Sequence, residues 1–131
     1  MQDYAPQTIR AAAILTGSHV AGTVLGPFAG AGLNPALANQ LQLLVDFTIG
    51  SLTTGEVKVE FSHDGTNYFQ DTFLSISGAT ATASAGVYQF AGTGKYILNI
   101  PIKCAHIKIS AKGNGTATGS SMSILAILGT V

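Results

Sequence analysis

The stretch that most constrains the fold runs from Glu56 to Asp71 and has the sequence EVKVEFSHDGTNYFQD. In its first half, Val57, Val59 and Phe61 alternate with polar and charged side chains. A period of two is typical of a β-strand with one buried side and one solvent-facing side. We therefore expect a strand here, with its apolar side turned toward a core.

A turn signal follows this strand directly. Asp64-Gly65 stands between the first apolar run and a second one that begins at Tyr68-Phe69. An Asp-Gly pair between two β-rich runs favours a hairpin, because glycine adopts the positive φ that tight turns require. More than two residues separate the runs, so we expect a longer or bulged turn over Ser62 to Asn67.

The rest of the chain repeats this pattern of short strand, glycine-rich turn and short strand. It predicts an all-β, antiparallel β-sandwich or jelly roll of seven or eight strands, without a long helix. Pro101 is expected at a strand end or sheet edge, because it cannot donate a ladder hydrogen bond. The expected strands are 40–49, 56–63, 68–74, 87–91, 95–102, 105–111 and 121–128, with a turn over 52–55 and a flexible loop tip over 75–86.

The N-terminal third has a different character. Thr8 to Thr16 favours a short strand, Ser18 to Pro35 holds four glycines and two prolines, and Pro35 to Asn39 could form one helical turn. We therefore expect residues 1–39 to be an arm and an irregular apolar segment that packs on the sandwich or on a neighbour. Residues 40–131 form the sandwich, and the whole chain is one domain.

Composition limits the classes of partner. Charged residues are 9% of the chain and the net charge is zero, against about 25% charged residues in an average soluble domain. No basic field exists to attract nucleic acid or an anionic membrane. A weakly charged surface indicates that neighbouring subunits cover part of it, so we expect a homo-oligomer in contact with other proteins.

The sequence contains no recognisable chemical site. The histidines at 19, 63 and 106 are too scattered for a metal motif, and Asp64 is interpreted as the residue that starts a turn. Ser18-His19, Ser62-His63 and Asp46 form no recognisable triad, and no glycine-rich phosphate loop is present. We expect no catalytic, cofactor-binding or metal-binding residues, and no enzyme activity.

Three further groups of side chains have a structural interpretation and a functional one. Cys104, the single cysteine, is interpreted as a small core residue, so no disulfide is expected within the chain. The lysines at 103, 108 and 112 favour a solvated or inter-subunit face. The tyrosines at 4, 68, 88 and 96 favour core or cross-strand packing, although Tyr68, Tyr88 or Tyr96 could instead stack on sugar rings.

The C-terminal two thirds resemble a known kind of protein. The order Val-Glu-Phe-Ser-His-Asp-Gly-Thr-Asn-Tyr-Phe, then Lys-Tyr-Ile, then Ala-His-Ile-Lys-Ile-Ser-Ala-Lys-Gly-Asn-Gly resembles β-sandwich virion proteins of tailed phages, over about Val57 to Leu128. In that type a strand ends in a Ser-x-Asp-Gly-x-x-Tyr turn and a later strand carries an Ile-Lys-Ile core. Lys108 replaces the usual arginine of the penultimate strand, and no tryptophan follows the Asp-Gly turn.

The resemblance implies a structural role in a phage particle assembled in the host cytoplasm. We expect a head decoration or cement protein that binds the major capsid protein across subunit junctions, with a neck or tail protein as the alternative. An alternative of a different class is a carbohydrate-binding β-sandwich module, because similar patterns occur in such modules. No catalytic residue is implied, because the resembled proteins are structural.

Overall fold

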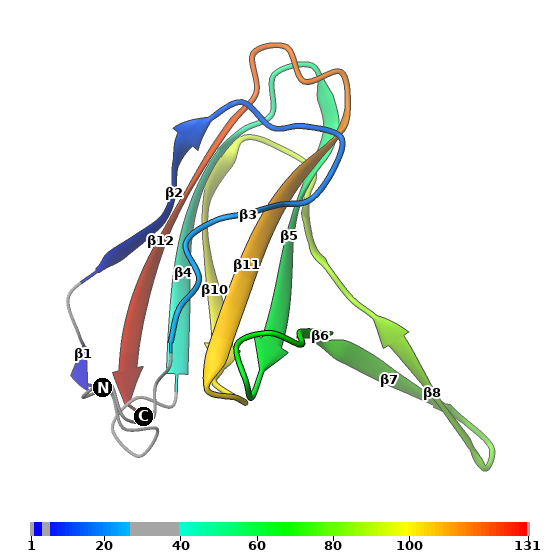
Figure 1. The fold of residues 1–131 in the computed structure, drawn as a ribbon. Coiled ribbons are helices and arrows are strands. Elements are labelled where there is room, and N and C mark those ends of the chain that lie inside the picture. Colours follow the sequence, from blue (N-terminus) through cyan, green and yellow to red (C-terminus); the bar gives the residue numbers. More distant parts are fainter. Residues whose placement is uncertain (1, 4–5, 27–39, 131) are drawn as a thin grey trace.

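The computed structural model describes residues 2–3, 6–26 and 40–130 (Figure 1). These residues confirm an all-β, antiparallel fold. They form twelve strands, against the seven or eight expected, and the jelly-roll order stays a prediction. The strands are β1 (Gln2–Asp3), β2 (Gln7–Ala13), β3 (Val20–Ala21), β4 (Gln40–Thr48), β5 (Leu52–Ser62), β6 (Phe69–Gln70), β7 (Thr72–Ser77), β8 (Thr80–Ala85), β9 (Tyr88–Phe90), β10 (Gly94–Pro101), β11 (His106–Gly115) and β12 (Ser121–Thr130).

Two five-stranded sheets make up the body. Sheet A has the order β1-β12-β4-β10, and β2 also pairs with β12; sheet B has the order β3-β11-β5-β6, and β9 also pairs with β5. The long strands alternate between the sheets, since β4 is in sheet A, β5 in sheet B, β10 in A, β11 in B and β12 in A. Pro101 ends β10 at an edge of sheet A, as expected.

The core lies between the two sheets and is formed by the inward-facing half of each long strand. The burial pattern of β4 alternates along the whole strand, and Leu41, Leu43, Val45 and Phe47 are buried. Sheet B contributes the corresponding inward residues, and all of them form one cluster. The largest fully buried side chains of sheet B are Val57, Ile107 and Ile109.

The N-terminal segment closes one side of this body. β2 lies along β12 of sheet A, and the chain then crosses so that β3 pairs with β11 of sheet B (Figure 1). Leu25 continues this pairing, since its backbone exchanges two hydrogen bonds of 2.9 Å with Ile107. Ile9, Leu15 and Leu25 are buried in the shared core. The helical turn expected over 35–39 lies outside the described residues.

The turn expected over Leu52 to Gly55 is wrong. These residues begin β5, where Gly55 pairs with Gly113 and Thr54 with Asn114. The turn lies earlier in the chain, between β4 and β5, where Gly50 has a φ of +55°. The glycine at 55 has a packing role that a sequence pattern does not reveal.

The flexible loop tip expected over Ser75 to Gly86 is also wrong. The chain there forms a regular hairpin of β7 and β8, with Thr72 paired to Ala85 and Ser77 to Thr80. Gly78 has a φ of +60°, as the first residue of a tight hairpin turn requires. Every residue of both strands is exposed, so neither strand has the buried face that marks a half-buried strand.

Candidate functional surfaces

The outer face of sheet A carries an apolar stripe. Ile97 of β10 and Leu125 of β12 are both register partners of Leu44 on the strand between them. Side chains at paired positions share one face of a sheet, so the three form a row that crosses three strands. Ile97 is 63% exposed. The next row consists of Lys95, Asp46 and Ser123.

The two rows line a shallow hollow of about 400 Å³. Its lining residues come from the same three strands, β4, β10 and β12. Leu44 is the apolar residue among the outward-facing positions Gln40, Gln42, Asp46 and Thr48 of β4. The structure places Leu44 at the centre of this outer surface, where a partner could cover it.

The outer face of sheet B is polar, and three of its charged side chains lie close together. The carboxylate of Glu60 lies 3.4 Å from Nζ of Lys58 and 3.8 Å from Nζ of Lys108. Lys108 also lies over the ring of Tyr68, 4.4 Å from its centroid. This contrast with sheet A shows that only one of the two outer faces has an apolar stripe of this kind among the described residues.

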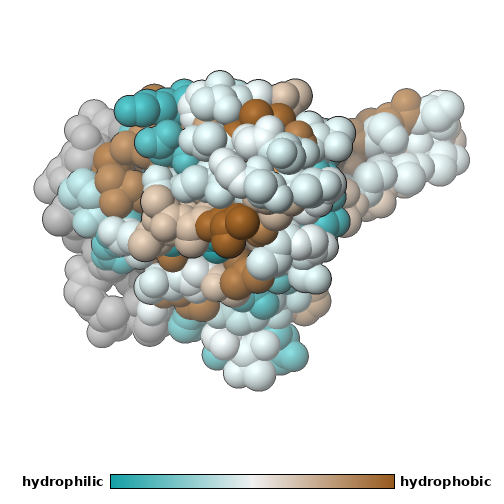
Figure 2. Space-filling model, turned by 90° about the horizontal axis from the view of Figure 1, so that it is seen from above, coloured by the Kyte–Doolittle hydropathy of each residue, from teal (hydrophilic) through white to brown (hydrophobic). Residues whose placement is uncertain are grey.

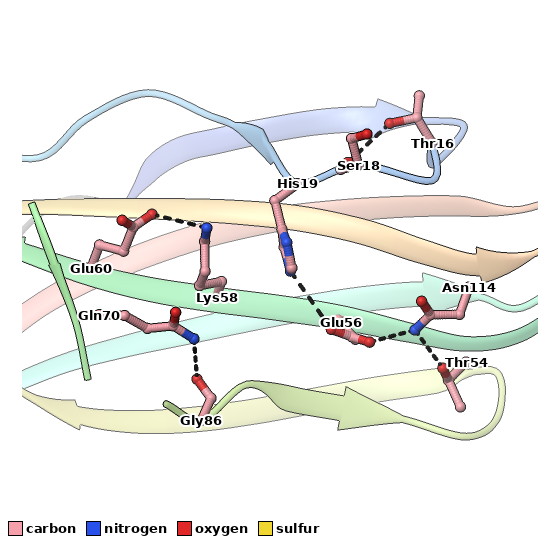
Figure 3. Close-up of polar contacts among 10 residues, drawn as sticks. All are labelled: Thr16, Ser18, His19, Thr54, Glu56, Lys58, Glu60, Gln70, Gly86 and Asn114. Carbon is pink, nitrogen blue, oxygen red and sulfur yellow. Dashed lines mark hydrogen bonds and ion pairs between the residues drawn. The ribbon is translucent and has the colours of Figure 1, made fainter. Parts of the chain in front are cut away.

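A buried polar network links the N-terminal segment to sheet B (Figure 3). The ring of His19 points toward Glu56, with Nε2 lying 3.6 Å from Oε1. The other carboxylate oxygen accepts a hydrogen bond from Asn114, whose amide also donates to Thr54 at 2.9 Å. Burial, together with the nearby charge of Lys58, lowers the pKa of His19 below its usual 6.5.

Asp64 organises the turn between β5 and β6, which agrees with the interpretation from the sequence. Its Oδ1 accepts hydrogen bonds of 2.8 Å from the backbone N–H groups of Thr66 and Asn67. The amide of Asn67 donates to Oδ2, and the hydroxyl of Ser62 donates to Oδ1. These bonds to the charged form, led by those from the backbone of Asn67 and Thr66, hold the pKa of Asp64 well below its usual 3.8.

The structure brings one pair of reactive side chains together that the sequence did not suggest. Sγ of Cys104 lies 3.6 Å from Nε2 of His63, beside a small hollow of about 240 Å³. Cys104 is half-buried rather than fully within the core. The pair forms because β5 ends and β11 begins at the same end of sheet B, where Ser62 pairs with His106. The two residues are 41 positions apart, so the sequence does not reveal their contact.

The other candidate polar residues stay apart. Asp46 lies on the outer face of sheet A, His19 contacts Glu56, and the buried hydroxyl of Ser62 bonds within its own turn. Within residues 2–3, 6–26 and 40–130, no three His, Cys, Asp or Glu side chains lie close enough to hold a metal ion together. No helix in this described part is long and apolar enough to span a membrane.

Two of the tyrosines considered for sugar stacking are used in packing. The rings of Tyr96 and Phe90 lie 4.6 Å apart, and the hydroxyl of Tyr96 donates to the carbonyl of Gly92 at 2.7 Å. Tyr88 packs against the edge of the core. Tyr68 lies beneath Lys108, and Tyr4 is outside the described residues.

The β7–β8 hairpin, Thr72–Ala85, extends away from the body (Figures 1 and 2). It contains no charged side chain, and three large apolar side chains on β7 are exposed: Phe73 at 58%, Leu74 at 69% and Ile76 at 76%. Its base is held by a hydrogen bond from the N–H of Gly86 to the carbonyl of Asp71. Exposed apolar surface on a protruding element is typical of a site that contacts another protein. We call this hairpin the contact arm.

A comparison with models of known protein families gives no match.

Proposed function

We propose that the protein is a structural component of a tailed-phage virion, and specifically a decoration or cement protein of the head. The observation that carries an assembly role is the β7–β8 hairpin. Its twelve strand residues are all exposed, and three of the six on β7 are large and apolar.

The β7–β8 hairpin has few contacts to stabilise it in an isolated chain. A two-stranded hairpin is marginally stable in water by itself, and exposed Phe73, Leu74 and Ile76 would favour association or aggregation in a free monomer. A partner surface that covers the hairpin removes both disadvantages. The protein is therefore best suited to a state in which other chains surround it.

The body supports the same role through its rigidity and its surface. Two sheets share one continuous core, and the charges on sheet B are mostly paired with one another. Figure 2 shows a surface with few strongly hydrophilic regions on the side in view. Many copies could therefore pack around a shell with little mutual repulsion.

The assignment to a phage head follows from the resemblance. The patterns that carry the resemblance fall on two elements of sheet B. Ser62 to Tyr68 forms the turn that follows β5, where Asp64 accepts backbone hydrogen bonds, and Ile107-Lys108-Ile109 lies in β11. A position at the neck or tail is the alternative within the same class. In each case the partners are other copies of this chain and a capsid or other virion protein.

Purified particles provide the test. Gel densitometry would give the copy number, and electron microscopy would locate the protein. We expect hundreds of copies on the head; a handful at one vertex would indicate the neck or tail. Absence from every particle, together with saturable binding to glycans, would contradict the proposal in favour of a carbohydrate-binding module.

A further inference from the structure

The apolar stripe on sheet A lies beside two opposite charges that have no ion-pair partner among the described residues. Lys95 of β10 and Asp46 of β4 are register partners, and both side chains are exposed. The ion pairs of the described residues join Glu56, Glu60 and Asp71 to cations elsewhere and involve neither of them. The outer face of sheet A therefore presents one cation and one anion side by side on neighbouring strands. They lie next to the apolar row of Ile97 and Leu44.

The register makes this surface complementary to itself. Consider a two-fold axis that lies in the contact plane, runs parallel to the strands and passes midway between β4 and β10. Rotation about this axis places each residue of β10 opposite its own register partner in a second copy. Lys95 would face Asp46 of the other copy, and Ile97 would face Leu44. Asn99 and Gln42, also register partners, would be exchanged in the same way.

We propose that the outer face of sheet A docks on the same face of a second copy of this chain through this two-fold arrangement. Sheets that pack face to face lie about 10 Å apart with nearly aligned strands, a spacing that side chains of this size can fill. Each pair of facing residues then occurs twice in the contact, which is the property of an isologous interface.

Charge decides between this arrangement and the alternatives on the same face. An axis along β4 itself would place Asp46 against Asp46 of the second copy, and like charges in contact oppose association strongly. The axis between β4 and β10 instead gives four charges that alternate in sign. Leu44 and Ile97, which line the hollow, would be covered by the partner's side chains.

The expected contact is small. Two strands of eight or nine residues from each copy overlap directly, so the buried area falls below the roughly 1,600 Å² of a standard interface. We therefore expect a weak, reversible dimer of the purified protein. The inference concerns the isolated chain, so it stands whether or not the protein is found in phage particles.

Complementary charge reversals test the geometry. Lys95→Glu would place two carboxylates together across the contact, because Asp46 of the second copy faces this position. Asp46→Lys would place two ammonium groups together in the same way. Sedimentation equilibrium should show that each variant alone associates at least about tenfold more weakly than the wild type. An equimolar mixture of the two should recover the wild-type affinity, because both contacts then join opposite charges.

The mixture is the decisive measurement, because no effect within one chain can restore association between two different variants. Lys112→Glu, on the outer face of sheet B, is the matched control and should leave association unchanged; circular dichroism checks that every variant folds. A wild type that stays monomeric, or reversals that leave association unchanged, would overturn the proposal. So would a mixture that fails to associate. Loss of the dimer only when Thr72–Ala85 is removed would instead assign the contact to the hairpin.

Discussion

The ring of Phe47 on β4 occupies the space that a side chain at Gly55 of β5 would need. A Cβ atom at position 55 would lie 2.7 Å from Cε1 and Cζ of this ring, closer than side-chain carbons approach one another. Phe47 is completely buried, so it cannot move aside into solvent. The contact joins the two sheets across the core.

Substitution of this glycine should therefore strain the core. We expect Gly55→Ala to lower the free energy of unfolding by about 1–3 kcal/mol, because the added methyl group displaces a fully packed ring. Urea denaturation measures the change. Gly92→Ala is the control, because a Cβ there meets no atom within 4 Å, and it should change stability by less than about 0.5 kcal/mol. Equal effects of the two substitutions would contradict the packing argument.

His19 should make stability depend on pH. Its lowered pKa means that the folded chain binds a proton there less readily than the unfolded chain does. The contribution of His19 is therefore present above its usual pKa of 6.5 and is lost as the pH falls below that value. Urea denaturation between about pH 8 and pH 5 should show a smaller loss of stability in His19→Gln than in the wild type. An identical pH dependence in both proteins would exclude this role.

Asp64 should hold the β5–β6 turn closed. Asp64→Ala removes the acceptor of the Thr66 and Asn67 amides, so both N–H groups should exchange faster with deuterium. The lowered pKa of Asp64 places its contribution above pH 3.8 and predicts its loss as the pH falls below that value. Asp64→Asn keeps one side-chain oxygen and should retain part of the protection. Unchanged exchange in the alanine variant would show that the turn does not need this side chain.

The hairpin should be dispensable for folding. No residue of Thr72–Ala85 belongs to the core cluster, and its two ends lie close together, since Gly86 bonds to Asp71. Replacement of this segment by Asn-Gly should leave the circular dichroism spectrum of the body and its urea midpoint nearly unchanged. The same variant should lose attachment to particles if the contact arm mediates it. A variant that fails to fold would show that the hairpin stabilises the body.

The thiol of Cys104 should react under native conditions. It is half-buried beside a hollow, and the imidazole nitrogen of His63 lies within reach of its proton. An aromatic disulfide reagent should titrate one thiol per folded chain, and His63→Gln should slow the reaction because it removes the nearest proton acceptor. His106→Gln, with a ring that packs over Gly65 in the same region, is the matched control. Equal rates in the two variants would show that His63 does not assist the thiol.

Local patterns predicted the strands that have one buried face. The alternation in Gln40–Thr48 and Glu56–Ser62 corresponds to observed strands, because each has a core on one side only. The strand expected over 68–74 includes the start of β7, but residues 75–85 were taken for a loop because both faces of this hairpin are exposed and its small residues give no apolar face. Gly55 was taken for part of a turn because the ring that requires a glycine there comes from a different sheet.

The surfaces depend on pairings that a single sequence does not contain. Leu44 is visible in the sequence as an apolar residue between Gln42 and Asp46, but its neighbours Ile97 and Leu125 come from strands whose order in sheet A the sequence does not give. Cys104 and His63 meet for the same reason. Asp64 was interpreted correctly because its partners lie within three residues of it.

The strand order of sheet A also bears on how the chain is made. β4 leaves the ribosome before either of its neighbours, since β10 begins at Gly94 and β12 at Ser121. Throughout that interval the backbone of β4 has no ladder partner and its apolar side is uncovered. The strand is therefore open to wrong pairing with other nascent chains. Pairing between such distant segments is also slow to form. Rapid, high-level translation should therefore favour inclusion bodies, and slower synthesis or a chaperone that shields β4 should raise the yield of folded protein.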